Sequence, residues 1–286
     1  MNNGISLVGA LGRSPPIDVL MATYNSGDYL EDAIQGVMKC VPVHRIIAAD
    51  HFSTDSTVEV LSRHGASVYF ENVSLGYARQ LLVEKAGTEV LMMLDSDVIL
   101  EPAEWYQEAL GLLGKVGADR RRVGAVVLLP SRLSVSPLQR YTNFWWRVRP
   151  SSKRRFFLTH STLFLKEALQ GITIPSQLSA AEDAFVWLHL RKRGFSTTLI
   201  EVPGVHQFVK SESKGRWMGA NLRILEAIVG VAAFPFVLRN IIFYPFLALT
   251  AAIFTRDSEL LLYNVRRWLG YLAGFQSYRK YRILRR

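Results

Sequence analysis

Short apolar runs alternate with longer amphipathic stretches from Ile17 to about Val127, and this alternation constrains the fold more than any other feature of the chain. The apolar runs are Ile17–Ala22, Ile46–Ala49, Val68–Phe70, Val90–Leu94 and Val123–Leu129. The amphipathic stretches lie near Tyr29–Met38, Val58–Arg63, Tyr77–Lys85 and Trp105–Leu113. Continuous apolar runs of this length are typical of strands buried on both faces, with helices as the crossovers between them. The pattern therefore predicts an α/β fold with a mostly parallel sheet flanked by helices.

The positive charge of the chain is concentrated in one segment. Of 286 residues, 34 are Lys or Arg and 24 are Asp or Glu, which gives a formal net charge of +10. Between Arg120 and Lys166 there are eleven basic residues and no acidic one, so the remaining residues sum to −1. A local excess of this kind indicates an anionic partner, such as a membrane surface or a nucleic acid. A lone cysteine, Cys40, excludes an intramolecular disulfide and fits a reducing compartment.

Segment 227–254 is apolar and carries a single charge, Arg239. Its two uncharged pieces, of 12 and 15 residues, are each too short to span a bilayer as a helix, which takes about 20 residues. One helix of 28 residues would reach about 42 Å and could cross, but it would separate the basic residues that flank both ends. Interfacial or re-entrant helices, bent near Pro235 and Pro245, would keep both basic ends on the cytoplasmic side.

The last segment supports an association with membranes. Five apolar residues recur at helical spacing with arginines beside them: Leu261, Val265, Trp268, Leu272 and Phe275. This pattern is typical of a basic amphipathic helix. We therefore expect two units, an α/β domain over residues 1–222 and a helical membrane-associated region over residues 223–286. A soluble helical subdomain or a dimer interface is the alternative for the second unit.

Polar side chains follow four successive predicted strands. They are Thr23-Tyr24-Asn25, then Asp50, then Glu71-Asn72 with Arg79 shortly after, and finally Asp95-Ser96-Asp97. Ligands of open α/β sheets bind outside the carboxyl ends of the strands, so these groups would converge on one rim. Turn residues and helix caps account for one or two such groups, but not for all four together. The sequence thus predicts a binding site at this edge of the sheet.

Asp95 and Asp97 are the most specific element of this site. In an extended segment, the side chains at positions i and i+2 point to the same side of the chain. Two carboxylates placed where the sheet opens to solvent suit Mg²⁺ or Mn²⁺ that also contacts phosphate oxygens. Acids at this spacing are also common in turns and caps, so the surrounding motifs carry the argument.

Several segments resemble the motifs of family-2 glycosyltransferases, which have the GT-A fold. Asp18–Asn25 looks like the opening strand of that family, and Asp50–Thr57 is similar to its nucleotide loop. Asn72–Arg79 resembles the start of its next helix, and Asp95-Ser96-Asp97 its metal motif. Three later segments look like its acceptor half: Thr159–Lys166, Ala181–Asp183 and Leu190–Phe195. The resemblance extends from Ile17 to His206, about two thirds of the chain.

The resemblance implies a nucleotide-sugar donor and a divalent metal ion, Mg²⁺ or Mn²⁺. The donor-binding residues that it implies are Thr23, Tyr24, Asn25, Asp50, Arg79, Asp95 and Ser96. The metal ligands that it implies are Asp95, Asp97 and His206. The chain departs from the family motif at His51-Phe52, where an acid or Asn followed by Gly is usual. This departure leaves the base open between the uracil of a UDP-sugar and the guanine of a GDP-sugar.

The same resemblance implies that Asp183 is the general base of an inverting transfer. Ser179 and Glu182 have the spacing of a capping box, which would give Glu182 a structural role and leave Asp183 facing the site. One base without a covalent intermediate implies inversion at the anomeric carbon. The residues expected on the acceptor side are Glu182, Trp145, Trp146, Arg154, Arg155, Arg216 and Trp217.

Together these features predict a metal-dependent, inverting glycosyltransferase that moves a sugar from a nucleotide-sugar to a lipid-linked acceptor on the cytoplasmic side of a membrane. Two alternatives stay open. A soluble glycosyltransferase acting on protein or free glycan would share the site and bury segment 227–254 in a helical interface. A basic nucleic-acid-binding module would explain the net charge, but the acidic pair would repel phosphate without a metal, so we expect no nucleic-acid partner.

Overall fold

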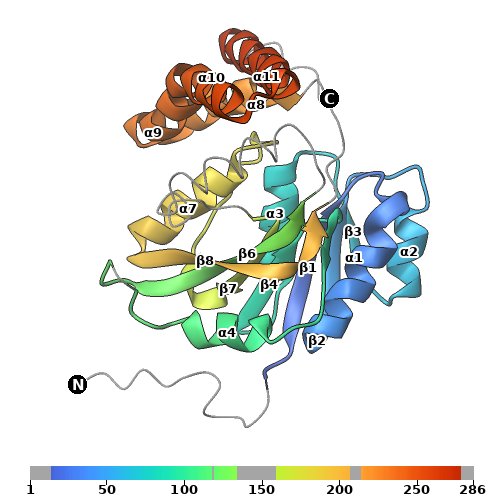
Figure 1. The fold of residues 1–286 in the computed structure, drawn as a ribbon. Coiled ribbons are helices and arrows are strands. Elements are labelled where there is room, and N and C mark those ends of the chain that lie inside the picture. The colour runs from blue at the N-terminus through green and yellow to red at the C-terminus, as the bar shows by residue number, and fades with distance from the viewer. Residues whose placement is uncertain (1–13, 118, 134–158, 207–213, 278–286) are drawn as a thin grey trace.

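A mixed sheet of eight strands forms the centre of the computed structural model, which describes residues 14–117, 119–133, 159–206 and 214–277 (Figure 1). The strands are β1 Ile17–Thr23, β2 Val43–Asp50, β3 Ser67–Phe70, β4 Val90–Leu94, β5 Val98–Leu100, β6 Arg122–Leu133, β7 Ser161–Leu165 and β8 Phe195–His206. Their order across the sheet is β3-β2-β1-β4-β7-β6-β8-β5. Six strands run in one direction, and β5 and β7 run against them.

The predicted strands are confirmed, and the mostly parallel sheet with them. The five apolar runs form β1, β2, β3, β4 and β6. The sequence pattern does not predict the two antiparallel strands, because β5 has only three residues and β7 begins with polar Ser161-Thr162. β7 lies between β4 and β6, so the sheet is mixed at this point.

Helices on both sides of the sheet connect the strands (Figure 1). The four predicted crossover helices are confirmed as α1 Gly27–Cys40, α2 Thr57–Arg63, α3 Leu75–Lys85 and α4 Trp105–Leu112. The short helix α6 Lys166–Leu169 follows β7, and α7 Glu182–Lys192 leads into β8. Helix α1 buries the apolar side that its periodicity predicts, with Leu30, Ile34 and Val37 facing the sheet core.

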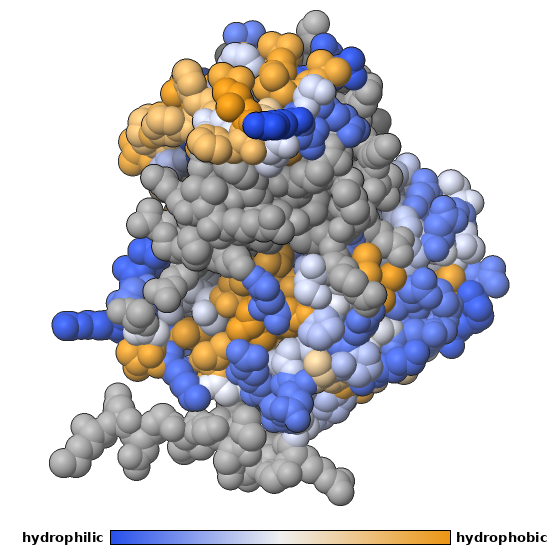
Figure 2. Space-filling model, in the orientation of Figure 1, coloured by the Kyte–Doolittle hydropathy of each residue, from blue (hydrophilic) through white to orange (hydrophobic). Residues whose placement is uncertain are grey.

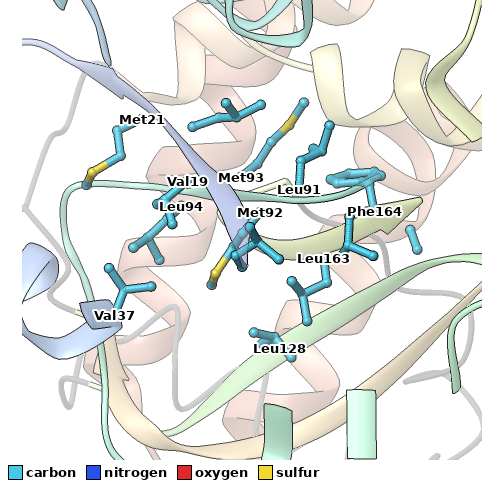
Figure 3. Close-up of a cluster of buried hydrophobic side chains, with 14 of the residues drawn as sticks. Val19, Met21, Val37, Leu91, Met92, Met93, Leu94, Leu128, Leu163 and Phe164 are labelled. Atoms are coloured by element: carbon cyan, nitrogen blue, oxygen red, sulfur yellow. The ribbon is translucent and has the colours of Figure 1, made fainter. Parts of the chain in front are cut away.

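The core lies where the central strands β1 and β4 meet the flanking elements. All five residues of β4 are buried, and so are six of the seven residues of β1. Figure 3 shows side chains of β1 and β4 close to Leu128 of β6, Phe164 of β7 and Val37 of α1. Burial of apolar surface on both faces of these strands stabilises the fold and holds the strand ends as a fixed rim.

A buried carboxylate fastens the start of β1. Asp18 is fully buried, and its Oδ2 accepts hydrogen bonds from Arg45 Nη2 at 3.1 Å and from the Gly87 amide at 2.6 Å. His44 Nδ1 lies 2.8 Å from the other carboxylate oxygen. Burial alone would raise the pKa of Asp18, but the hydrogen bonds from Arg45, Gly87 and His44 lower this pKa to about 2. Asp18 thus ties β1 to β2 and to the loop before β4.

The C-terminal residues form a group of helices that lies over α7, at the top of Figure 1. They are α8 Lys214–Val229, the 3-10 turn η2 Gly230–Ala233, α9 Phe234–Val237, the π-helical segment η3 Leu238–Phe243, α10 Tyr244–Thr255 and α11 Ser258–Gln276. Helix α8 runs across residue 222, the expected boundary between the two units. Among the described residues, one helical run, Gly215–Thr255, is long and apolar enough to cross a membrane.

This helical run changes its hydrogen-bonding pattern near both prolines. Pro235 and Pro245 lie in the first turns of α9 and α10, where the missing N–H costs little, and the segments η2 and η3 precede these turns. A proline cannot donate to the carbonyl four residues before it. The carbonyl of Ile241, four residues before Pro245, instead accepts a hydrogen bond from Trp268 Nε1 at 2.8 Å. Trp268 thereby joins α11 to η3.

Two pairs of glycines, each pair four residues apart, bring α11 against α8: Gly215 with Gly219 and Gly270 with Gly274. An added Cβ at Gly219 would meet Tyr271 O at 2.1 Å, and one at Gly274 would meet Arg216 O at 1.9 Å. Only glycine permits two backbones to approach this closely. Small residues at this spacing are typical of closely packed helices, above all in membranes. The spacing of these glycines is visible in the sequence.

The apolar side chains predicted to line one face of α11 differ in their exposure. Leu261, Trp268, Leu272 and Phe275 are half-buried, but Val265 is exposed. The fully buried side of α11 instead consists of Leu260, Asn264, Tyr271 and Gly274. The glycine contact causes the difference, because Gly274 has to face α8.

Large apolar side chains of the C-terminal helices are exposed, and Figure 2 shows them gathered at the top of the molecule. The most accessible, each more than 60% exposed, are Val231, Phe234, Phe246, Ile253 and Phe254. They belong to η2, α9 and α10, and we call them the apolar surface. Contiguous apolar side chains of this size are rare on the surface of a soluble monomer and indicate an interaction site.

Candidate functional site

Strands β1 and β2 end side by side at the predicted rim. Their last residues, Thr23 and Asp50, are register partners and both are buried. Thr23 Oγ1 donates to Asp50 Oδ1 at 2.8 Å. Ser53 donates to the same carboxylate through its hydroxyl at 2.6 Å and its amide at 2.7 Å. Asp50 therefore holds the loop after β2 in place from below the rim.

An aromatic group covers this part of the rim. Tyr24 is 59% exposed, and its ring meets the edge of the His51 ring at a centroid distance of 5.3 Å. Phe52 and Phe70 are stacked at 5.4 Å, and each is more than half exposed. His51-Phe52, where the chain departs from the family motif, thus adds exposed ring surface beside Tyr24. Exposed aromatic faces at the ends of strands suit the stacking of a planar base.

Asn25 and Ser96 connect neighbouring loops of the rim. Asn25 has a left-handed backbone, with φ of 46°, and its side-chain oxygen accepts a hydrogen bond from the Thr54 amide at 2.9 Å. Asn tolerates this conformation better than most residues. Ser96 Oγ lies 2.8 Å from Ser26 Oγ, which joins the loop after β4 to the start of α1. Both residues were expected to bind the donor, and in the structure they fix the loops that would surround it.

The buried Arg79 forms an ion pair with Asp95, whose side chain is about one third exposed. Arg79 is 1% exposed, and its Nη2 donates to Asp95 Oδ1. Gly76, at the start of α3, allows this placement because a Cβ there would meet Pro175 O at 2.6 Å and Leu178 O at 2.7 Å. Burial would raise the pKa of Asp95, but the Arg79 guanidinium lowers it. Arg79 Nε and Nη1 are buried, and within the described residues neither has a hydrogen-bond partner.

Asp97 lies beside His206, as the predicted metal motif requires. The short strand β5, which follows Asp97 directly, pairs with the end of β8, so that Val98 and His206 are register partners. Asp97 Oδ1 and His206 Nε2 are 3.4 Å apart. The segment Asp95-Ser96-Asp97 is a turn, closed by the Val98 amide on Asp95 O, and not the extended segment that the sequence predicts. The two carboxylates therefore have different partners.

His160 is a site residue that the sequence analysis does not single out. Its carbonyl accepts from the Asp95 amide at 2.7 Å, and its ring meets the His206 ring at 4.8 Å. Burial lowers the pKa of His160 to about 3, so the ring is neutral. Pairing of β7 with β4 brings it there, and the sequence pattern does not predict β7.

The chemistry of the donors fits a hard divalent cation. Carboxylate oxygens from Asp95 and Asp97 and an imidazole nitrogen from His206 are ligands that Mn²⁺ accepts. Within the described residues, no three such groups already converge closely enough to hold a metal ion. The cause lies in the turn, because Asp95 is directed toward Arg79 and Asp97 toward His206.

Helix α7 begins at Glu182, but not with the predicted capping box. Ala181 precedes the helix in a left-handed conformation, with φ of 62°. The Ser179 amide donates to Asn221 Oδ1 at 2.7 Å and not to Glu182. Asn221 lies on α8 and also accepts from the Ala180 amide at 3.0 Å. The loop before α7 is therefore fixed by α8, and this long-range contact overrides the local capping signal.

Glu182 and Asp183 stand next to each other at the start of α7, within electrostatic reach of Arg79. Glu182 is buried, with Thr159 Oγ1 at 3.4 Å, whereas Asp183 is half-buried. Burial and the neighbouring Asp183 carboxylate raise the pKa of Glu182 to about 7. Burial also raises the pKa of Asp183, although the Ala184 amide and Arg239 counteract it. A raised pKa makes a carboxylate a stronger proton acceptor, which favours the role of general base.

The expected acceptor-side residues divide into two groups. Glu182, Arg216 and Trp217 are described: Arg216 is exposed on α8 and Trp217 is half-buried beside it. The others lie outside the described residues: Trp145, Trp146, Arg154 and Arg155.

Comparison with known proteins agrees with this geometry. The sequence model of Glycosyl transferase family 2 matches residues 18–169, slightly more than half of the chain. No curated protein matches the sequence. Mannosyltransferase PcManGT from Pyrobaculum calidifontis, solved in complex with GDP-Man and Mn²⁺, is 16% identical with a TM-score of 0.61, over 95% of this chain and 87% of that chain.

A second solved structure gives the same result. Glucosyl-3-phosphoglycerate synthase from Mycobacterium tuberculosis, in complex with Mn²⁺ and UDP-glucose, is 17% identical with a TM-score of 0.53, over 75% of this chain and 79% of that chain. Likenesses at this level of identity concern the fold. They establish the GT-A fold for this chain.

Proposed function

The chain belongs to glycosyl transferase family 2, and from this premise we propose that it transfers a sugar from a nucleotide-sugar to a lipid-linked acceptor at a membrane surface. That it is a glycosyltransferase follows from the family. The observation that carries the proposal is the packing of the C-terminal helices, with their apolar surface, on α7, the helix that begins with Glu182-Asp183.

The rim offers complementary groups for a nucleotide-sugar. Tyr24, Phe52 and Phe70 present exposed rings on which the base would stack. Arg79 has two buried donor nitrogens that find no acceptor among the described residues, and the diphosphate of the donor would supply acceptors. Similar folds are solved with UDP-glucose and with GDP-Man, which supports either base.

Asp95, Asp97 and His206 would hold Mg²⁺ or Mn²⁺. A divalent cation next to the diphosphate supplies stabilisation of the negative charge that develops on the leaving group. Similar folds are solved with Mn²⁺, which supports this assignment. Asp97 and His206 are already neighbours, so these two residues need to move less than Asp95.

Asp183 would act as the general base. Its half-buried carboxylate would take a proton from the acceptor group as the acceptor oxygen forms its bond to the anomeric carbon. The bond from that carbon to the diphosphate breaks, and its electron pair leaves with the nucleotide. A single displacement of this kind inverts the configuration. Glu182 lies deeper, and with its pKa raised to about 7 it is protonated, and therefore neutral, at acid pH.

The exposed apolar residues of the C-terminal helices favour an acceptor in a membrane. Val231, Phe234, Phe246, Ile253 and Phe254 are exposed, and segment 227–254 contains no acidic residue. Such a surface can enter the apolar boundary of a bilayer while nearby arginines meet anionic headgroups. The acid-free basic segment from Arg120 to Lys166 adds to this attraction, which fits a position on the cytoplasmic leaflet.

The proposal is tested with purified full-length protein, a panel of UDP- and GDP-sugars with Mn²⁺, and vesicles that contain anionic lipid and polyprenyl phosphate. We expect flotation with the vesicles and transfer of radiolabelled sugar into the lipid fraction. Transfer to free glycan or protein without vesicle binding would favour the soluble glycosyltransferase instead. Tight RNA or DNA binding that ignores Mn²⁺ and nucleotide-sugars would contradict both.

A further inference from the structure

Arg239 is the one charged residue in segment 227–254, and it is exposed. It lies in η3, a π-helical segment, a geometry that often marks a functional position in a helix. Phe234 precedes it by five residues and Phe243 follows it by four, about one turn away in each direction. Both phenylalanines are about half exposed or more. A single cation thus lies among exposed apolar side chains, which suggests that it binds an anionic group.

The packing of α9 on α7 brings this segment to the proposed base. Ala181 and Ala184, on either side of Glu182-Asp183, share an apolar cluster with Ala233, Phe236 and Val237. The ring of Trp187 on α7 meets the Phe236 ring at 5.8 Å. Arg239 follows this contact directly along the chain.

Arg239 influences Asp183 electrostatically but forms no ion pair with a carboxylate of the described residues. Arg239 counteracts the rise in the pKa of Asp183 that burial causes, so the two groups are within electrostatic reach. No carboxylate of the described residues forms an ion pair with Arg239. Its guanidinium retains planar donors that match a phosphate group.

We propose that Arg239 binds the phosphate group of the acceptor, a phosphate monoester at the end of an apolar chain, and holds it beside Asp183. This inference rests on the proposed function and names its acceptor: the apolar chain lies along the exposed phenylalanines, and the phosphate meets Arg239, the one charged residue of segment 227–254. Arg239 also offsets the repulsion between the Asp183 carboxylate and an anionic acceptor, which would otherwise keep the two apart.

The transfer then joins the sugar to a phosphate oxygen. That oxygen forms the bond to the anomeric carbon as the bond from the carbon to the nucleoside diphosphate breaks, and the electron pair leaves with the diphosphate. When the acceptor phosphate is a monoanion, its remaining proton goes to Asp183. When it is a dianion, no proton needs to move. The product is a sugar phosphodiester of the apolar chain.

The test compares Arg239→Gln and Arg239→Lys with wild type and with the control Arg256→Gln, an exposed arginine at the end of α10. The probes are a short isoprenyl phosphate and its free alcohol, both in the same detergent. We expect the phosphate, but not the alcohol, to raise the Tm of wild type and of Arg256→Gln, and this shift to be lost in Arg239→Gln. We expect the KM for the phosphate acceptor to rise by about 10- to 100-fold in Arg239→Gln and less in Arg239→Lys.

Two further readouts separate this inference from the proposed function. The KM for the nucleotide-sugar and the Tm shift that the nucleotide-sugar causes without acceptor are expected to stay unchanged in Arg239→Gln. If wild type uses the donor but responds equally to the alcohol and the phosphate, or if Arg239→Gln keeps the wild-type KM for the phosphate, the inference is wrong while the glycosyltransferase remains. If wild type neither binds nor hydrolyses any nucleotide-sugar, the proposed function and the inference fail together.

Discussion

At the scale of single residues, the site consists of buried and half-buried charged groups that compensate one another. Arg79 neutralises Asp95, His206 lies beside Asp97, and His160 stays neutral because it is buried. Among the described residues, the cations that lower the pKa values of Glu182 and Asp183 are Arg79 and Arg239. Neither forms an ion pair with the two acids, so burial raises both pKa values. Two carboxyl groups with raised pKa values, Glu182 and Asp183, therefore lie near Asp95, whose pKa is lowered.

The two neighbouring acids of α7 are expected to differ in their effect on catalysis. Asp183→Asn removes the proton acceptor, so below about pH 6, where the acceptor phosphate still carries a proton, kcat should fall by about 10²- to 10⁴-fold while donor binding is kept. Glu182→Gln resembles the protonated form of a buried side chain, so its kcat should fall by less than about tenfold. Single-turnover transfer assays measure both. Equal losses of kcat in the two variants would mean that Asp183 is not the general base.

Asp18 is expected to make stability depend on acid pH. Its folded pKa of about 2 is below its unfolded value, so its contribution is complete above pH 4 to 5 and is lost as the pH falls toward 2. The shift corresponds to about 2 kcal/mol of unfolding free energy. The difference between wild type and Asp18→Asn in urea unfolding should therefore be largest near pH 7 and shrink below pH 4. Asp32→Asn, an exposed acid on α1, is the control, and a difference for Asp18→Asn that does not change with pH would contradict this account.

At the scale of elements, the sequence predicts what periodicity and local motifs encode. The apolar runs and the helices between them are confirmed because each is a local pattern, and the motif residues Asp97 and His206 lie together as the family resemblance implies. The strands β5 and β7 are not predicted, because they are defined by pairing with distant strands. His160 is missed for the same reason, since it directly precedes β7. The capping box fails for a similar reason, since Asn221 on α8 takes the Ser179 amide.

The contact between α8 and α11 is expected to depend on its glycines. In Gly274→Ala, the added Cβ would stand 1.9 Å from Arg216 O, so the helices have to separate. Overpacking of this kind costs about 1 to 3 kcal/mol, and we expect the variant to lower Tm while donor binding at the rim persists. Gly111→Ala is the control, because its Cβ would meet nothing nearer than Lys115 Nζ at 3.9 Å. A Gly274→Ala protein with wild-type Tm would show that α11 does not pack on α8 in this way.

At the scale of the whole molecule, the catalytic rim and the apolar surface belong to one arrangement. Helix α8 fixes the loop before α7 through Asn221, and α9 packs on α7 through Phe236 and Trp187. Insertion of the apolar surface into a membrane would thus place the start of α7 near the headgroups. The sequence alone separates the two units by composition, but it contains no signal for how closely they are joined.

The most direct test of the central claim is metal-dependent binding of a nucleotide-sugar at the rim. Thermal unfolding is measured for wild type, Asp97→Ala and the control Asp32→Ala with UDP- and GDP-sugars, with and without Mn²⁺. We predict that one nucleotide class, with Mn²⁺, stabilises wild type and Asp32→Ala, by about 2.7 kcal/mol at a ligand concentration of about 100 Kd. Asp97→Ala should lose the part of this stabilisation that requires Mn²⁺. Binding that needs no metal and is unchanged in Asp97→Ala, or no binding of any nucleotide-sugar, would contradict the account.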